Sequence, residues 1–262
     1  MNNSKTLLVM AGGTGGHVFP GLAVADKLKQ QGWHIYWLGT ADRMEAQLVP
    51  EHGYSIDFID IAGVRGNGLK RMLLAPFKII KSIMQARRVL KQRDIKLVLG
   101  MGGFASGPGG VAAWSMGIPV ILHEQNAAMG LTNRILSHFA NKVLLGFSGV
   151  VKTDKAVLVG NPVREKLINL PEKKISNEDN PLKVLVVGGS LGAKALNELL
   201  PKVVKQFTAA QITIIHQTGK NDFNRIKKIY DELGIQADVF DFTKDFISKM
   251  NECDFCVSRA GA

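Results

Sequence analysis

The stretch LLVMAGGTGGHVFPGLAVA (7–25) decides the fold, because it runs from an apolar strand through a glycine turn into a helix. Five apolar residues lead into Gly12–Gly16, and apolar side chains recur at helical spacing after Pro20. A second stretch, VLVVGGSLGA (184–193), has the same order of strand, turn and helix. Two such starts in one chain predict two similar domains of the Rossmann type.

Short apolar runs continue this pattern along the chain and alternate with helical segments. The predicted strands are 6–11, 35–38, 56–59, 97–99, 120–122, 143–145, 157–159, 184–187, 212–215, 239–240 and 255–257. Most are continuously apolar, which is typical of parallel strands covered on both faces. We therefore predict an α/β fold with two doubly wound parallel sheets, one in residues 1–160 and one in residues 161–262. The second domain is expected to be incomplete, because the chain stops just after a strand.

Length, composition and charge exclude several classes of protein. The 262 residues suffice for two ordinary domains, and a net charge of +11 predicts an anionic partner. Two cysteines exclude a disulfide framework, and a single C-x-x-C on a predicted strand is expected to be buried rather than metal-binding. No secretory signal is present. The uncharged stretch 97–122 contains seven glycines and two prolines, so buried strands fit it better than a membrane span.

Three glycine-rich turns follow predicted strands, at 12–16, 100–110 and 188–192. Such a turn exposes backbone N–H groups at the positive end of the next helix, which suits a phosphate. One turn alone is as easily a tight turn that needs positive φ, whereas three at strand ends favour a binding crevice. No P-loop motif occurs, and no acid ends the second strand to hold a nicotinamide ribose, which disfavours an oxidoreductase. No D-x-D pair is present, so neither a metal nor a cofactor is predicted.

Polar residues stand beside these turns. His17 follows the first turn at the start of a helix, where a neutral imidazole acts as a general base or merely positions a phosphate; both interpretations stay open. The run His123-Glu124-Gln125-Asn126 ends a buried strand, and Asn126 is expected to reach the ligand. Arg164, after the seventh predicted strand, either binds a phosphate or a base or lies in an exposed hinge turn.

The segment 65–96 concentrates ten basic residues with one acid. As a helix it presents a first apolar stripe and, beside it, a second stripe with a basic flank. The second stripe and two residues of its flank are Leu73, Phe77, Ile80, Met84, Lys78 and Lys81. One stripe suffices for packing on a sheet, so two indicate binding to an anionic membrane surface. A wide core face and a nucleic-acid surface are the alternatives, although a single aromatic residue argues against base stacking.

Six motifs together resemble one protein family. They are LVMAGGTGGHVFPGLAVA (8–25), WLGTADRMEAQLVP (37–50), GMGGFASGPGG (100–110), IPVILHEQNAAMGLTNR (118–134), VGNPVR (159–164) and VLVVGGSLGA (184–193). Over essentially the whole chain they resemble the MurG family of bacterial N-acetylglucosaminyltransferases, which have the GT-B fold. The resemblance implies an inverting hexosyltransferase that moves GlcNAc from UDP-GlcNAc to the 4-hydroxyl of MurNAc in undecaprenyl-pyrophosphoryl-MurNAc-pentapeptide, converting lipid I into lipid II.

The resemblance also implies a location and a set of site residues. It puts the protein at the cytoplasmic face of the bacterial inner membrane as a peripheral protein, with the lipid acceptor on the N-terminal domain, the nucleotide sugar on the C-terminal domain and no nucleic acid. The implied substrate-binding residues are Thr14, Gly15, Gly16, Asn126, Arg164, Ser190, Thr243 and Ala262, and His17 is the base or an acceptor-positioning residue. In the family further donor-site segments follow the position of Ala262. We therefore expect a truncated chain that is a poor catalyst, or a non-catalytic nucleotide-sugar-binding fragment.

Overall fold

The structure is a computed structural model that describes residues 5–61, 69–170, 180–189, 192–243 and 246–259. It divides into two compact units, the first ending at Glu165 and the second beginning at Lys166. Each unit has its own sheet and its own hydrophobic cores. Each is described by itself below.

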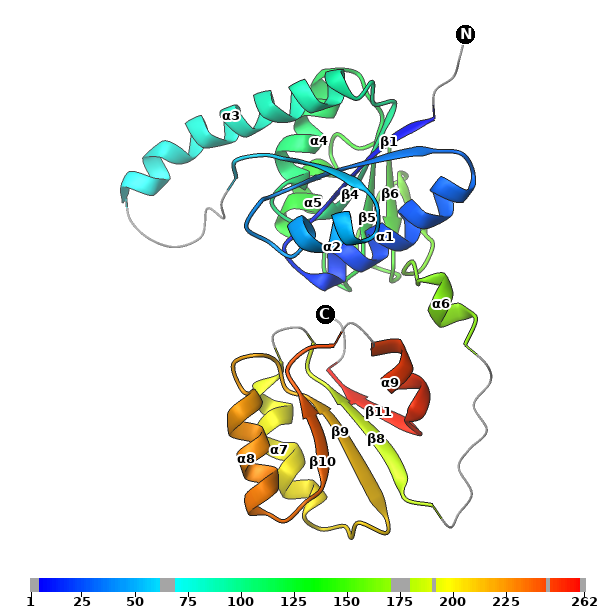
Figure 1. The fold of residues 1–262 in the computed structure, drawn as a ribbon. Coiled ribbons are helices and arrows are strands. Elements are labelled where there is room, and N and C mark those ends of the chain that lie inside the picture. Colours follow the sequence, from blue (N-terminus) through cyan, green and yellow to red (C-terminus); the bar gives the residue numbers. More distant parts are fainter. Residues whose placement is uncertain (1–4, 62–68, 171–179, 190–191, 244–245, 260–262) are drawn as a thin grey trace. The chain divides into compact units, whose positions relative to one another are not determined.

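A parallel sheet of seven strands forms the middle of the first unit (Figure 1). The strands are β1 (Thr6–Ala11), β2 (His34–Gly39), β3 (Ser55–Phe58), β4 (Leu97–Gly102), β5 (Val120–Glu124), β6 (Lys142–Leu145) and β7 (Ala156–Leu158). Their order is β3-β2-β1-β4-β5-β6-β7, so the direction of winding reverses between β1 and β4. The helices that follow these two strands cover opposite faces of the sheet, and open α/β sheets bind ligands at such a switch point.

Helices cover the sheet of the first unit on both faces. Helices α1 (Gly15–Gln30) and α2 (Glu45–Glu51) pack on one face, where Leu7 and Val9 of β1 meet Trp37. Helices α3 (Leu69–Gln92), α4 (Ser106–Ser115) and α5 (Leu131–Leu136) pack on the other, against Leu8 and Met10. Successive residues of β1 thus enter two different cores, which explains why this strand is continuously apolar. The short helix α6 (Glu165–Ile168) follows β7 in the chain.

The second unit repeats this plan on a smaller scale. Strands β8 (Leu182–Val187), β9 (Ile212–Gln217), β10 (Ala237–Phe240) and β11 (Phe255–Ser258) form a parallel sheet in the order β10-β9-β8-β11. Helices α7 (Lys194–Val204) and α8 (Phe223–Glu232) cover one face, and α9 (Phe246–Glu252) packs on the other. The order matches that of the first four strands of the first unit, which confirms the predicted internal repeat.

The described residues confirm the predicted α/β fold with two parallel sheets. Each predicted strand is present within a few residues of its expected bounds. One expectation about the cysteines is wrong: Cys253 is buried but precedes β11, and Cys256 on β11 is exposed. The reason is that β11 lies at the edge of its sheet, so a short apolar run there is not covered on both sides.

Candidate functional site

A buried carboxylate holds the first glycine turn. Glu45, at the start of α2, is 1% exposed and accepts hydrogen bonds from the Gly13 N–H (3.0 Å), the Thr40 N–H (3.1 Å) and the Thr40 hydroxyl (2.8 Å). A Cβ at Gly12 would collide with this carboxylate and displace it from these hydrogen bonds. The turn between β1 and α1 is therefore fixed by a side chain that comes some thirty residues later in the sequence.

The second glycine turn packs directly on the first. Gly102 and Gly103, at the end of β4, adopt φ values of 107° and 93°, and a Cβ at Gly103 would collide with the backbone of Gly12. The Ser106 hydroxyl lies 2.8 Å from both the Met10 and the Gly102 carbonyl oxygens and so ties the two turns together. The two turns that flank the switch point thus form one rigid edge.

His17 lies at the junction of these two turns. Its Nδ1 is 3.2 Å from the Gly12 carbonyl oxygen and 3.4 Å from the Thr14 hydroxyl. Because a carbonyl oxygen only accepts, Nδ1 donates the proton, and Nε2 of the neutral ring keeps its lone pair. Nε2 lies 2.9 Å from the place that a Cβ of Gly102 would occupy, so the glycine leaves room for the ring. This tautomer has an unprotonated nitrogen, as a general base requires.

A second buried carboxylate organises the loop after β5. Glu124 accepts hydrogen bonds from the Asn126 N–H (3.2 Å) and side-chain amide (2.9 Å), and from Gly130 N–H (3.1 Å) and the Asn133 side-chain amide (3.0 Å). Four charge-assisted bonds to one group make a rigid loop. Asn126 is therefore held at the carboxyl end of β5, half-buried, with its NH₂ group engaged by Glu124.

The guanidinium of Arg164 lies over the Phe19 ring, and that ring packs against the first glycine turn. Its Cζ is 4.7 Å from the centroid of the Phe19 ring, and that ring is 3.0 Å from the place that a Cβ of Gly15 would take. Among the described residues no carboxylate pairs with this guanidinium, and burial lowers the pKa of Arg164. A partly desolvated cation that pairs with no carboxylate in the described part of the chain is suited to bind an anion. Arg164 is half-buried, and both roles, a phosphate or base ligand and a hinge residue, stay predictions.

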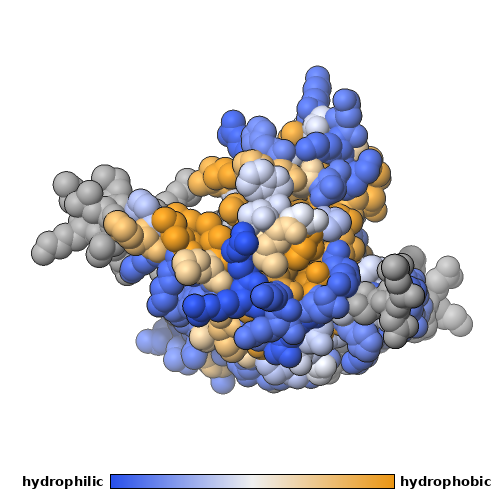
Figure 2. Space-filling model, turned by 90° about the horizontal axis from the view of Figure 1, so that it is seen from above, coloured by the Kyte–Doolittle hydropathy of each residue, from blue (hydrophilic) through white to orange (hydrophobic). Residues whose placement is uncertain are grey.

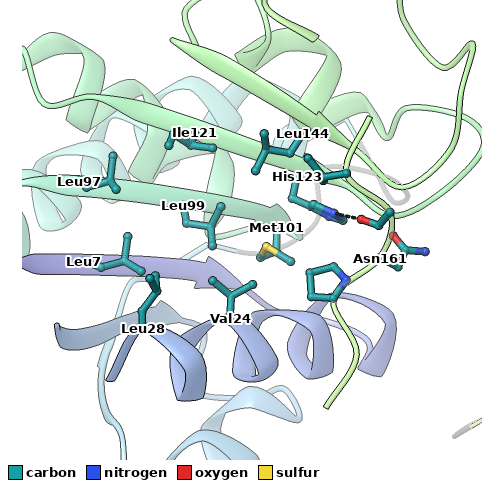
Figure 3. A pocket seen from close by; sticks show the side chains of 13 residues that line it. Leu7, Val24, Leu28, Leu97, Leu99, Met101, Ile121, His123, Leu144 and Asn161 are labelled. Atoms are coloured by element: carbon teal, nitrogen blue, oxygen red, sulfur yellow. Dashed lines mark hydrogen bonds between the residues drawn. The ribbon is translucent and has the colours of Figure 1, made fainter. Parts of the chain in front are cut away.

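An apolar cavity of about 320 Å³ lies between the sheet of the first unit and α1 (Figure 3). Leucines of β1, β4 and α1 line it, and His123 and Asn161 are its polar side chains. His123 Nε2 is 3.0 Å from the Gly160 carbonyl oxygen, and Asn161 donates to the Gln125 carbonyl at 3.1 Å. These two bonds attach the segment that leads to Arg164 to the end of β5. Burial lowers the pKa of His123, so the ring is neutral near pH 7.

In the second unit the buried side-chain amide of Asn197 has the supporting role that the Glu45 carboxylate has in the first unit. Asn197 of α7 donates to the Thr218 carbonyl at 2.9 Å and to Asp222 at 2.8 Å, and its oxygen lies 3.2 Å from His216 Nε2. Tyr230 completes the chain, with its hydroxyl 3.0 Å from His216 Nδ1. A Cβ at Gly192 would overlap the Thr218 carbonyl, so the turn after β8 rests on the loop after β9.

Comparisons with known proteins show which family this chain belongs to. The model of the glycosyltransferase family 28 N-terminal domain matches residues 7–145, and that of the family 28 C-terminal domain matches residues 183–262. The chain belongs to glycosyltransferase family 28. Family 28 membership makes it a glycosyltransferase, and the two glycine turns of the first unit fall within the N-terminal match.

Relatives within family 28 are similar over the whole chain. A protein of Psychromonas ingrahamii is 67% identical over 262 residues, which are 100% of this chain and 74% of the relative. An Aeromonas hydrophila protein is 57% identical over 99% of this chain and 72% of its own length. Both are named UDP-N-acetylglucosamine--N-acetylmuramyl-(pentapeptide) pyrophosphoryl-undecaprenol N-acetylglucosamine transferase. The chain thus spans about three quarters of the length of these relatives.

Solved structures agree with the family 28 fold. The crystal structure of Acinetobacter baumannii MurG matches with a TM-score of 0.73 and 39% identity, over 98% of this chain and 72% of that one. A UDP-GlcNAc 2-epimerase of Neisseria meningitidis matches with a TM-score of 0.61 at 14% identity, which shows a shared fold alone. The GT-B architecture expected from the sequence is therefore confirmed.

The predicted site residues fall into three groups. Thr14, Gly15, Gly16 and His17 lie together on the first turn, and Arg164 joins them through Phe19. Asn126 stands at the end of β5, and Thr243 follows β10, half-buried. Ser190 and Ala262 lie outside the described residues. Sequence reasoning missed Glu45 and Asn197, because each supports a turn whose residues are distant along the chain.

The predicted membrane helix α3 buries the C-terminal part of its first stripe and exposes its second stripe. Ala86 and Leu90 of the first stripe are in the core, whereas Ile79 of that stripe is 37% exposed. In the second stripe Phe77 is 71% exposed, and Ile80 and Met84 are about half exposed. Figure 2 shows apolar side chains gathered on this face beside hydrophilic ones. Lys81 pairs with Asp60 at 2.8 Å, and both side chains stay exposed. The side chain of Leu73 lies outside the described part. No helix in the described part of the chain is long and apolar enough to cross a membrane.

Proposed function

We propose that this chain transfers GlcNAc from UDP-GlcNAc to the 4-hydroxyl of MurNAc in undecaprenyl-pyrophosphoryl-MurNAc-pentapeptide and so forms lipid II. The observation that carries the proposal is the match to the Psychromonas relative, 67% identical over the whole chain, whose name states these substrates. Three features support this function: the glycine turns after β1 and β4, the loop that Glu124 holds, and Arg164, which pairs with no carboxylate among the residues that the structure describes.

In this proposal His17 removes the proton of the acceptor hydroxyl. The hydroxyl oxygen attacks the anomeric carbon of GlcNAc, the bond to the UDP oxygen breaks, and the proton passes to Nε2. The Nδ1 bond to the Gly12 carbonyl supports the base role, because it holds the tautomer with a free Nε2. Leaving UDP carries negative charge, which Arg164 and the N-terminus of α1 at Thr14, Gly15 and Gly16 stabilise. Asn126, Ser190, Thr243 and Ala262 are proposed as the remaining substrate contacts.

A transfer assay tests this function. The chain is incubated with radiolabelled UDP-GlcNAc and a short-prenyl analogue of lipid I, and labelled product is quantified. We expect His17→Ala to lower kcat by about 100-fold or more, with a smaller change in the KM for UDP-GlcNAc. If the chain binds UDP-GlcNAc in calorimetry but forms no product, the alternative of a non-catalytic nucleotide-sugar-binding module is correct. Unchanged kcat in His17→Ala would exclude the base role.

We also propose that the exposed stripe of α3 binds an anionic membrane surface, at the cytoplasmic face of the inner membrane. Three observations support this: the exposed Phe77, Ile80 and Met84 share one face, the helix carries seven basic residues and no acid, and Lys78 flanks the stripe. Trp114 and Phe139 add an exposed aromatic pair, with centroids 4.7 Å apart, from the neighbouring α4 and the segment after α5. Exposed aromatic rings favour the membrane–water interface.

Vesicle sedimentation tests the membrane proposal. Wild type should bind vesicles with anionic lipid more strongly than neutral ones, and Phe77→Ser with Lys78→Glu should reduce that binding about tenfold. Phe207→Ser is the matched control, because Phe207 is 47% exposed in the second unit. Equal loss in the control would show a general effect of surface hydrophobicity and contradict the proposal. Binding to single-stranded nucleic acid that depends on Lys78 would favour the alternative partner.

A further inference from the structure

Two buried polar side chains of the second unit, His216 of β9 and Tyr230 of α8, take no part in the proposed mechanism. The Tyr230 hydroxyl lies 3.0 Å from His216 Nδ1, and His216 Nε2 lies 3.2 Å from Oδ1 of the equally buried Asn197. Three polar side chains add no hydrophobic stabilisation to a core, and burying them costs free energy unless each is hydrogen-bonded. Their mutual hydrogen bonds, however, fix one geometry of the elements that carry them.

The direction of every hydrogen bond in this chain of side chains is set from one end. The Asn197 NH₂ group donates to the Thr218 carbonyl at 2.9 Å and to the Asp222 carboxylate at 2.8 Å, and both of these groups only accept. Oδ1 of Asn197 is therefore its acceptor, so His216 Nε2 carries a proton and donates to it. His216 Nδ1 is then unprotonated, and the Tyr230 hydroxyl donates to it. Burial lowers the pKa of His216 to about 4, so the ring is neutral near pH 7, as this arrangement requires.

The chain of hydrogen bonds ends at the loop that supports the turn after β8. Asn197 binds this loop, which follows β9, at two points, Thr218 and Asp222. A Cβ at Gly192 would overlap the Thr218 carbonyl and would lie 3.3 Å from the Gly219 Cα. Gly192 therefore packs directly on the loop, and α7 begins two residues later. A shift of the Asn197 amide would move the surface on which Gly192 and the start of α7 rest.

We propose that His216 and Tyr230 are positioning residues for the nucleotide sugar. They hold the Asn197 amide in the orientation that fixes the loop after β9, and this loop fixes Gly192 and the start of α7. The inference rests on the proposed function, in which Ser190, two residues before Gly192, contacts UDP-GlcNAc. N–H groups at the start of a helix bind phosphate oxygens, so the diphosphate is the part of the ligand whose binding depends on these two residues.

Equilibrium binding to the 262-residue chain tests this role with two probes, UDP and uridine, which differ by the diphosphate. His216→Leu removes the donor to Asn197, and its dissociation constant for UDP should rise about tenfold. His216→Gln keeps an NH₂ donor in that place and should stay within about threefold of wild type. Tyr230→Phe removes only the first hydrogen bond of the chain and should raise the dissociation constant for UDP about threefold. Uridine should bind wild type and all three variants equally.

Two control variants separate positioning from a general loss of stability. Ile226→Val removes one methyl group from the core of the second unit that also contains Tyr230. Tyr54→Phe removes a buried tyrosine hydroxyl, which donates to Asp26 in the first unit. Neither control should change the affinity for UDP. Amide hydrogen exchange adds a local measurement: the Gly192 N–H, which donates to the Gly189 carbonyl at 2.9 Å, should exchange faster in His216→Leu than in Ile226→Val.

The proposal is overturned if His216→Leu binds UDP like wild type, or if uridine binding is weakened as much as UDP binding. It is also overturned if Ile226→Val weakens UDP binding as strongly as His216→Leu, because the buried side chains then act on stability alone. If wild type binds neither UDP nor UDP-GlcNAc, the proposed function itself fails, and this inference fails with it. Circular dichroism verifies that each variant folds, and Tyr230→Phe, which removes a single hydroxyl, decides the test if His216→Leu does not fold.

Discussion

Glu45→Gln is the sharpest test of how the first glycine turn is built. The carboxylate accepts three hydrogen bonds, and its two oxygens serve different partners: Oε2 accepts from Gly13, and Oε1 accepts from the backbone and the hydroxyl of Thr40. A glutamine in the same space has one oxygen and one NH₂ group. Whichever way it turns, the NH₂ faces a backbone N–H that is already a donor, so one charge-assisted hydrogen bond is replaced by an unsatisfied pair.

The expected cost follows from these contacts. A hydrogen bond to a charged group contributes about 1.5–3 kcal/mol, and the remaining bonds lose the charge of their acceptor. The free energy of unfolding of the first unit should therefore fall by about 3 kcal/mol. In a unit of this size, that lowers the Tm by about 6–12 °C. Because the group is 1% exposed, solvent screening does not reduce the effect appreciably.

The assay is urea denaturation followed by tryptophan fluorescence, since Trp37 lies in the core beside the turn. Glu51→Gln is the control, because it makes the same chemical change on the exposed side of the same helix and should stay within about 0.5 kcal/mol of wild type. Amide hydrogen exchange adds a local readout: the Gly13 and Thr40 N–H groups should exchange faster in Glu45→Gln. A loss under 0.5 kcal/mol with unchanged exchange at both amides would refute the assigned role of Glu45.

Three further predictions concern the second unit and the loop after β5. Gly192→Ala should destabilise the second unit by more than about 3 kcal/mol in urea denaturation, because Gly192 has a φ of +77° and a Cβ there would overlap the Thr218 carbonyl. Gly234→Ala is the control: Gly234 has a φ of +65° but open space around it, so the change should cost only about 1 kcal/mol. Burial lowers the pKa of His216 from 6.5 to about 4. The neutral ring therefore stabilises the second unit fully above pH 6.5, and this contribution should fall by up to about 3 kcal/mol as the pH drops toward 4. In denaturation measured as a function of pH, His216→Gln should not show this loss of stability. Glu124→Ala should weaken UDP-GlcNAc binding about tenfold in calorimetry, since it removes the carboxylate that accepts both hydrogen bonds from Asn126. Unchanged affinity would remove Asn126 from the proposed donor site.

The strands could be predicted because each is a local pattern. Leu7, Leu8, Val9 and Met10 alternate between two cores, and a strand covered on both faces has to be apolar at every position. The same logic applies to Val184–Val187 in the second unit. The positions of the glycine turns follow from these strands, since each turn begins where an apolar run ends. The fold class and the positions of the glycine turns could therefore be predicted from the sequence.

The residues that hold the glycine turns in place, in contrast, could not be predicted from local sequence patterns. Glu45 lies in a short polar stretch with no periodicity, and only the tertiary fold brings its carboxylate to Gly13. Asn197 reads as an ordinary polar position of an amphipathic helix, yet it is fully buried against Thr218 and His216. A buried polar residue is recognised by its partners, and partners distant in sequence leave no spacing signal. The second apolar stripe of α3, in contrast, was predicted from helical spacing to face away from the sheet, and Phe77, Ile80 and Met84 are exposed.

Gly13 after β1 and Gly192 after β8 are supported by side chains of different charge. Beneath the turn after β1 lies the carboxylate of Glu45, and beneath the turn after β8 lies the neutral amide of Asn197, acting through the Thr218 carbonyl. A negative charge at the base of a turn offsets the positive end of the following helix, whereas an amide leaves it intact. The turn of the first unit therefore needs an added cation to hold a phosphate, and Arg164 is a side chain that the fold brings close to it. The two copies of the strand-turn-helix repeat thus keep the same strand order but differ in the charge of the side chains that support them.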